Sequence, residues 1–128
     1  MRILPRDRDC TVMIVDDSLF MRETLRSILH QSGYTVIAEA SDGIEAVMKY
    51  AELKPTITIM DVIMPNKGGI EATREIVSFD RDARILMSST LGFDDLVQSA
   101  LDAGAVSIIY KPYNGEEIHE IIDRVMQF

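Results

Sequence analysis

The chain has 128 residues, of which 47% are hydrophobic and 27% charged, a composition typical of a single globular domain. Its 13 basic and 21 acidic residues leave a net charge of -8, which argues against nucleic-acid binding because that function relies on neutralising phosphates. The single cysteine excludes an intrachain disulfide, and the sequence has neither a signal peptide nor a membrane-spanning apolar run, so we expect a cytoplasmic protein.

The first ten residues alternate charged and apolar side chains around a proline. We expect residues 1–10 to form a loose N-terminal arm that includes Cys10, because chain ends without a stabilising pattern are commonly loose. Residues 11–128 are expected to form the folded domain.

Five short apolar runs, several of them rich in valine and isoleucine, predict buried β-strands. In chain order they are residues 11–15, 35–40, 57–60, 84–88 and 106–110. Their starts are separated by similar stretches of chain, and each interval has room for one helix.

The intervals carry the periodicity of amphipathic helices. In the second interval, apolar residues share one predicted helix face, namely Ile44, Val47, Met48 and Ala51. The last segment extends this pattern, at Ile118, Ile121, Ile122, Val125 and Met126. Asp42 and Asn114 are predicted to cap helix N-termini, and Gly33 and Gly104 to follow helix C-termini.

Strands that alternate with helices predict an α/β fold with a parallel sheet and helices on both faces. Right-handed crossovers leave few topologies, and we predict a doubly wound, five-stranded sheet with strand order 2-1-3-4-5.

Polar residues occur where four of these strands end. Asp16 and Asp17 follow the first strand, Asp61 the third, residues 88–90 (Ser-Ser-Thr) close the fourth, and Lys111 follows the fifth. Any one of them alone is compatible with an ordinary loop or a helix cap. Because the carboxyl ends of parallel strands meet at one edge of a sheet, we expect these groups to converge there in a functional site.

Three carboxylates at one site repel each other, by about 3 kcal/mol per pair at roughly 5 Å and an effective dielectric constant of about 20. Lys111 and a divalent cation can offset this repulsion, and a set of hard oxygen ligands favours Mg²⁺. A cation, an ammonium and a hydroxyl together suit a phosphoryl group. Asp61 is then the predicted nucleophile that accepts this group.

The segments "MIVDDS", "MDVIMPNKGG", "SST" and "YKPY" occur in this order along the chain. They resemble the receiver domain of bacterial two-component response regulators, most of all the CheY-like single-domain chemotaxis regulators, whose fold is flavodoxin-like. The resemblance covers residues 11–128.

The resemblance also implies a role for individual residues. Asp61 is the phosphoacceptor, and Mg²⁺ is bound by Asp16, Asp17, Asp61 and the backbone carbonyl of Ile63. Ser89 and Lys111 bind the phosphoryl group, and the peptide bond between Lys111 and Pro112 is cis. Receivers commonly carry a switching aromatic ring three residues before this lysine. That position is Ile108 here, and Tyr110 lies on the same side of the strand.

By the same resemblance, the phosphoryl donor is a phosphohistidine of a sensor histidine kinase. Phosphorylation switches the binding of a downstream target, such as a flagellar motor switch, through the fourth helix, fifth strand and fifth helix. The apolar residues Ile63 and Leu91 flank the site and imply slow hydrolysis of the acyl phosphate. The resemblance thus implies a monomeric signalling switch rather than an enzyme.

Four alternatives remain at this point. The chain could be a phosphorelay intermediate or the isolated receiver domain of a longer transcription regulator. A flavin-binding electron carrier of the same fold requires a hydroxyl- and glycine-rich loop after the first strand, where this chain has Asp16, Asp17 and Ser18. A metal-dependent phosphatase requires a second acid just after Asp61, and residues 62–64 offer none.

Overall fold

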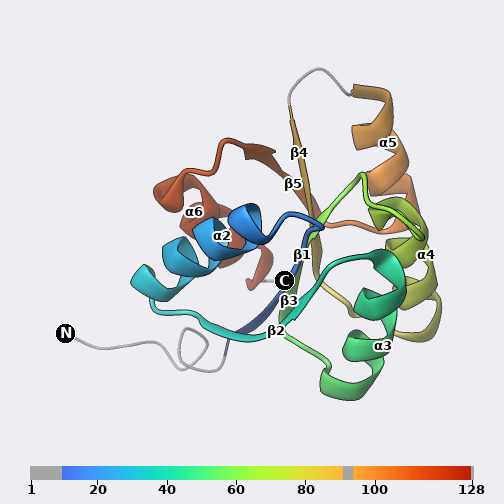
Figure 1. The fold of residues 1–128 in the computed structure, drawn as a ribbon, viewed down its shortest axis with the longest axis horizontal. Helices are drawn as coiled ribbons and strands as arrows, with labels where there is room; N and C mark the ends of the chain where they lie inside the picture. The colour runs from blue at the N-terminus through green and yellow to red at the C-terminus, as the bar shows by residue number, and fades with distance from the viewer. Residues whose placement is uncertain (1–9, 91–93, 128) are drawn as a thin grey trace.

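A computed structural model describes residues 10–90 and 94–127 of the chain as alternating strands and helices (Figure 1). The strands are β1 (Thr11–Val15), β2 (Thr35–Ala40), β3 (Ile57–Asp61), β4 (Ile85–Thr90) and β5 (Ser107–Lys111). The helices are α2 (Leu19–Gln31), α3 (Gly43–Leu53), α4 (Gly69–Phe79), α5 (Asp94–Ala103) and α6 (Gly115–Val125). Within the described ranges, no helix combines the length and apolar character needed to cross a bilayer.

The five strands form one parallel sheet in the order β2-β1-β3-β4-β5, which confirms the predicted topology. Helices α2 and α6 cover one face, and α3, α4 and α5 cover the other (Figure 1). Alternate strand residues therefore enter two cores. Met13 and Met60 belong to the core under α3, α4 and α5, whereas Ile14 and Ile59 belong to the core under α2 and α6.

The later strands extend further than the sequence patterns predicted. β3 includes Asp61, β4 ends at Thr90 and β5 ends at Lys111. Pairing explains the difference, because Asp61 lies opposite Ser88 and Thr90 lies opposite Lys111 in the parallel ladder. Asp61, Thr90 and Lys111 are therefore the last residues of strands rather than members of loops.

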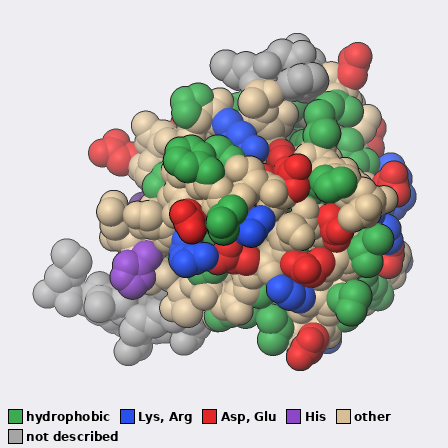
Figure 2. Space-filling model, viewed as in Figure 1, with side chains coloured by type: hydrophobic (Ala, Val, Ile, Leu, Met, Phe, Trp, Pro, Cys, Tyr) green, Lys and Arg blue, Asp and Glu red, His purple; other side chains and the backbone are tan. Residues whose placement is uncertain are grey.

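The predicted apolar face of α3 is buried only in part, at Val47, which packs against the core under α3, α4 and α5. Ile44 and Met48 are 48% and 66% exposed, and Ala51 is exposed as well, so hydrophobic side chains reach the surface here. Figure 2 shows hydrophobic side chains among charged ones over the molecular face in view. The buried residues of α3 are instead Gly43, Ala46 and Tyr50. A Cβ atom on Gly43 would lie 2.5 Å from the Lys67 carbonyl oxygen, so α3 approaches the β3–α4 loop closely through its small residues.

The other helical predictions are confirmed. Ile118, Ile121 and Ile122 of α6 are buried. Asp42 accepts a hydrogen bond from the Glu45 amide at 2.9 Å, and Asn114 accepts one from the Glu117 amide at 3.0 Å. Gly33 and Gly104 follow α2 and α5 with φ angles of 90° and 118°, the left-handed conformation that suits glycine at helix ends.

The placement of Cys10 in a loose arm is wrong. Its side chain is 1% exposed and belongs to the core under α2 and α6. Its carbonyl oxygen accepts a hydrogen bond from the Thr35 amide. The packed domain therefore includes Cys10, and residues 1–9 of the expected arm lie outside the described residues.

Candidate functional site

The three predicted carboxylates meet at the carboxyl end of the sheet. One carboxylate oxygen from each of Asp16, Asp17 and Asp61 lies within 4.8 Å of the others. Asp16 is buried, Asp61 is half-buried and Asp17 is exposed, so the cluster is open to solvent on one side. β1 and β3 are neighbouring strands, and their shared end brings these side chains together as predicted.

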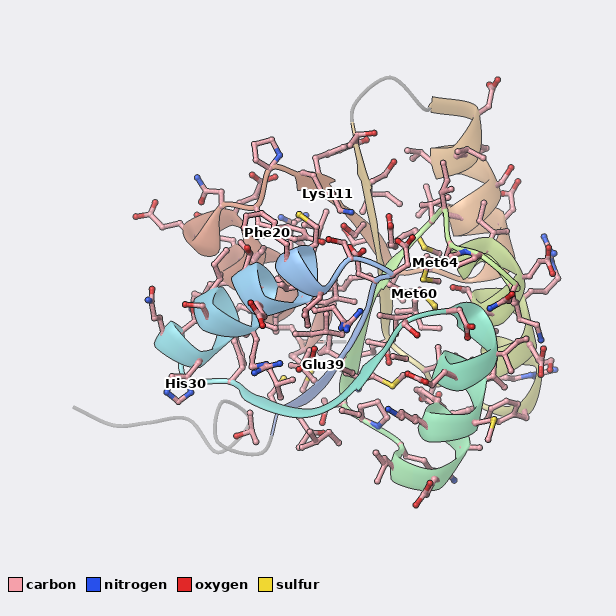
Figure 3. All side chains as sticks on the ribbon, in the orientation of Figure 1. Phe20, His30, Glu39, Met60, Met64 and Lys111 are labelled. Carbon is pink, nitrogen blue, oxygen red and sulfur yellow. The ribbon has the colours of Figure 1, made fainter. Side chains whose placement is uncertain are left out.

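Lys111 joins the cluster from β5, as predicted, and lies at the same end of the sheet as Met64 (Figure 3). Its Nζ atom lies 3.0 Å from Asp16 Oδ2 and 3.5 Å from Asp61 Oδ2. Burial alone would lower the pKa of the Lys111 ammonium, but its hydrogen bond to Asp16 and the charge of Asp61 raise that pKa overall. The lysine is therefore a fixed positive charge between two carboxylates.

The pKa of the Asp61 carboxyl is raised toward neutral pH. Burial raises its pKa, the Lys111 ammonium lowers it, and the charges of Asp16 and Asp17 raise it again, so that the pKa reaches about 6. One ammonium does not offset three carboxylates. This donor set consists of hard oxygen atoms, which fit Mg²⁺.

A neutral residue at position 61 is expected to stabilise the metal-free protein, but only above pH 3.8, the ordinary pKa of an aspartate in the unfolded chain. A raised folded-state pKa lowers stability progressively from pH 4 to pH 6 and fully above pH 6, by up to about 3 kcal/mol. In EDTA, Asp61→Asn should therefore raise the free energy of unfolding at pH 7.5 and leave it unchanged near pH 4. Urea denaturation measures the free energy of unfolding at both pH values. Equal effects of the substitution at pH 4 and pH 7.5 would contradict the raised pKa of Asp61.

Two other predicted residues lie at the ends of the strands that form the site, Ser89 within β4 and Ile63 just after β3. Ser89 is buried, and its hydroxyl donates to the Thr90 carbonyl oxygen at 3.1 Å. Ile63 follows β3, with its side chain 61% exposed. The roles of Ser89 and of the Ile63 carbonyl stay predictions. Leu91 lies outside the described residues.

The fifth strand carries the remaining predicted residues. Ile108 is half-buried and packs against the core under α3, α4 and α5, and Tyr110 is half-buried two residues further on. The Lys111–Pro112 peptide bond is cis. The structure therefore has an aliphatic side chain at the expected position of the switching ring, and the switching roles of Ile108 and Tyr110 stay predictions.

The sequence reasoning missed a pair of hydroxyl groups next to the site. Ser88, opposite Asp61 in the sheet, is fully buried, and its Oγ lies 2.7 Å from the Tyr113 hydroxyl oxygen. Burial raises the pKa of the Tyr113 phenol, which therefore stays protonated. The bond links the end of β4 to the loop that follows Lys111. Ser88 was visible within the "SST" motif, but no spacing rule connects it to position 113.

Removing the Tyr113 hydroxyl is expected to destabilise the protein by about 1–3 kcal/mol, because the buried Ser88 hydroxyl loses its partner. Adding Ser88→Ala to Tyr113→Phe should recover part of that loss, since both polar groups are then absent. Urea denaturation of the two single variants and the double variant gives the coupling energy. Additive losses would show that the two hydroxyls do not interact.

A family model of the response regulator receiver domain matches residues 12–123. The chain belongs to this family. The receiver is 44% identical over 114 residues to the chemotaxis protein CheY of Thermotoga maritima, covering 89% of this chain and 95% of that protein. It is also 41% identical over 113 residues to the transcriptional regulatory protein PdtaR of Mycobacterium tuberculosis, covering 88% of this chain but 54% of that protein.

Solved structures of similar chains have the same fold. One is the CheX–CheY–BeF3–Mg²⁺ complex from Borrelia burgdorferi, with a TM-score of 0.86 and 36% identity. The alignment covers 91% of this receiver and 88% of that chain. The family and the fold expected from the sequence are thus confirmed.

Proposed function

We propose that this receiver is a phosphorylatable response regulator that accepts a phosphoryl group on Asp61 and thereby switches the binding of a target protein. The observation that carries the proposal is the position of the Asp61 carboxylate. It lies at a strand end, 3.5 Å from the Lys111 ammonium and within a cluster of three carboxylates. The donor is a phosphohistidine of a sensor histidine kinase, and the pathway is chemotaxis or motility signalling in the cytoplasm. The CheY relative supports this choice.

In the proposed transfer, an Asp61 carboxylate oxygen attacks the phosphorus atom of the donor. An oxygen–phosphorus bond forms, the phosphorus–nitrogen bond breaks, and the nitrogen electron pair stays on the donor imidazole. Lys111 is placed to bind a phosphoryl oxygen. Asp16, Asp17, Asp61 and the Ile63 carbonyl are the proposed Mg²⁺ ligands, and the bound cation supplies charge stabilisation to the phosphoryl oxygens.

Switching is proposed to begin at Ser89. Its hydroxyl, which donates to the Thr90 carbonyl oxygen, turns toward the phosphoryl group and draws the end of β4 inward. The response reaches the surface formed by α5, β5 and α6, with Ile108 and Tyr110 as the positions that repack. The domain is then a monomeric switch that hydrolyses its own acyl phosphate slowly, and its target is a protein such as a flagellar motor switch.

A second candidate is a receiver that acts within a phosphorelay or at the head of a longer transcription regulator. The match to PdtaR favours it, because this chain spans about half of that protein. Both candidates use the same phosphorylation chemistry. The family assignment gives no comparable support to a flavin-binding carrier or a phosphatase.

Phosphorylation is tested by incubating the protein with acetyl phosphate and Mg²⁺ and measuring its intact mass. We expect a gain of about 80 Da, one phosphoryl group, in Mg²⁺ and no gain in EDTA. No gain under either condition, with the protein folded by circular dichroism, would contradict the proposal. The domain would then be a constitutive interaction module.

A further inference from the structure

Arg22 on α2 connects the acidic site to the edge of the sheet. Its guanidinium is mostly buried, with 17% of the side chain exposed. Nη1 donates to the Asp16 carbonyl oxygen at 2.7 Å, and Nε donates to Glu39 Oε1 at 3.1 Å. Glu39 belongs to β2 and is labelled next to α2 in Figure 3. One rigid, planar group therefore spans the β1–α2 loop and the edge strand.

The bond from Arg22 is one of several hydrogen bonds that hold Asp16 in place. The Asp16 amide donates to the Ala40 carbonyl oxygen at 3.0 Å. Its Oδ1 atom accepts from the Ser18 amide at 2.9 Å, and its Oδ2 atom accepts from Lys111 Nζ at 3.0 Å. Arg22 binds the further oxygen of this residue, its carbonyl oxygen. The same peptide plane contains the Asp17 Cα atom, so the bond restrains the point from which the Asp17 side chain departs.

We propose that Arg22 is a positioning residue for the divalent-cation site: it orients the Asp16–Asp17 peptide so that both carboxylates face the same ion. This inference rests on the proposed function, in which Asp16 and Asp17 bind Mg²⁺. Arg22 acts on the cation only through the backbone of its ligands. Groups of this kind, which hydrogen-bond to a ligand rather than to the metal, commonly change metal affinity by roughly 10–100-fold when removed.

Electrostatics alone predicts the opposite sign. Arg22 is a positive charge close to three carboxylates, and it opposes the binding of another cation. If charge were its only contribution, Arg22→Met would bind Mg²⁺ more tightly and Arg22→Lys would bind it as the wild type does. If Arg22 positions the loop, both substitutions weaken binding, because neither methionine nor lysine has the two-armed planar group.

Arg26 provides a matched control. It also binds the Glu39 carboxylate, through Nη2 and Oε2, and it lies on the same helix one turn later. Its hydrogen-bond partner is the Glu39 carboxylate rather than the Asp16 backbone. Arg26→Met therefore removes one positive charge and one Glu39 contact but leaves the Arg22–Asp16 bond in place.

The experiment is isothermal titration of Mg²⁺ into the metal-free wild type, Arg22→Met, Arg22→Lys and Arg26→Met. We expect the dissociation constant to rise at least roughly tenfold in both Arg22 variants and to stay within about twofold in Arg26→Met. Unchanged or tighter binding in Arg22→Met overturns the inference. So does an equal loss in all three variants, which would indicate a role in Glu39 pairing alone.

Two variants guard the test against an unfolded protein and against a role of Glu39 alone. If Arg22→Met does not fold by circular dichroism, Arg22→Lys retains the charge and an amine donor and serves in its place. Glu39→Gln weakens the hydrogen bond between Arg22 Nε and residue 39. It should also weaken Mg²⁺ binding, by a smaller factor than the Arg22 variants do. A wild type that binds no Mg²⁺ overturns the metal site, and this inference with it. A wild type that binds Mg²⁺ beside unchanged Arg22 variants overturns this inference alone.

Discussion

Asp61→Asn is expected to abolish phosphoryl incorporation, reducing the gain of about 80 Da with acetyl phosphate and Mg²⁺ to zero. The amide is nearly isosteric with the carboxylate but lacks the charged oxygen that forms the acyl phosphate. Position 61 is otherwise well suited to this change, because Lys111 keeps its 3.0 Å contact with Asp16 when it loses Asp61. The fold should therefore survive, and intact mass spectrometry measures the result directly.

The matched control is Asp95→Asn, which removes an exposed carboxylate on α5 that does not belong to the cluster. It should gain the phosphoryl group as the wild type does. Phosphorylation of Asp61→Asn at the wild-type level would assign the acceptor to another residue, and peptide mapping would identify it. A mass gain of the wild type in EDTA would show separately that phosphorylation does not require a divalent cation.

Gly69→Ala is expected to destabilise the protein by about 3 kcal/mol or more, a large part of the total stability of a small domain. Gly69 begins α4, and its amide donates to the Val62 carbonyl oxygen at 2.9 Å. A Cβ atom there would lie 2.1 Å from the Asp61 carbonyl oxygen. That oxygen belongs to the backbone of β3, so the clash can be relieved only by moving backbone, either the strand end that carries Asp61 or the start of α4.

Gly115→Ala is a control at the same position of another helix, because Gly115 begins α6. The nearest atom to its added Cβ is Ile28 Cγ2, at an ordinary contact distance of 3.4 Å. Its free energy of unfolding should stay within about 1 kcal/mol of the wild type. Urea denaturation compares the two variants, and similar small losses in both would show that the backbone at Asp61 yields easily.

The main features of the site were predictable because they depend on strand order and chemistry. Asp16, Asp61 and Lys111 each end an apolar run, and parallel strands bring such ends together. The chain positions of these residues and the polarity of their side chains therefore sufficed. Pairing then set the limits of β3 and β4 beyond the last apolar residue, which an apolar pattern cannot indicate.

Other features depend on contacts that cannot be predicted from the types of single residues. The buried face of α3 follows from how closely Gly43 approaches Lys67, whereas periodicity weighs large apolar residues such as Ile44 more heavily than small ones. The Tyr113–Ser88 bond and the Arg22–Asp16 bond join segments through side-chain geometry. Hydrophobic patterning carries no information about such polar contacts, because they depend on rotamers within the folded chain.

The ion pair between Lys111 and Asp16 joins residues that are 95 positions apart in the chain. Asp16 directly follows β1 and Lys111 ends β5, the first and last strands among the described residues, so the pair forms only after all five of these strands have left the ribosome. Contacts of such sequence separation are late events in folding. A nascent or C-terminally cleaved chain that lacks β5 therefore has Asp61 without its ammonium partner. Under the proposed function, such a chain would not be competent for phosphorylation until β5 is in place.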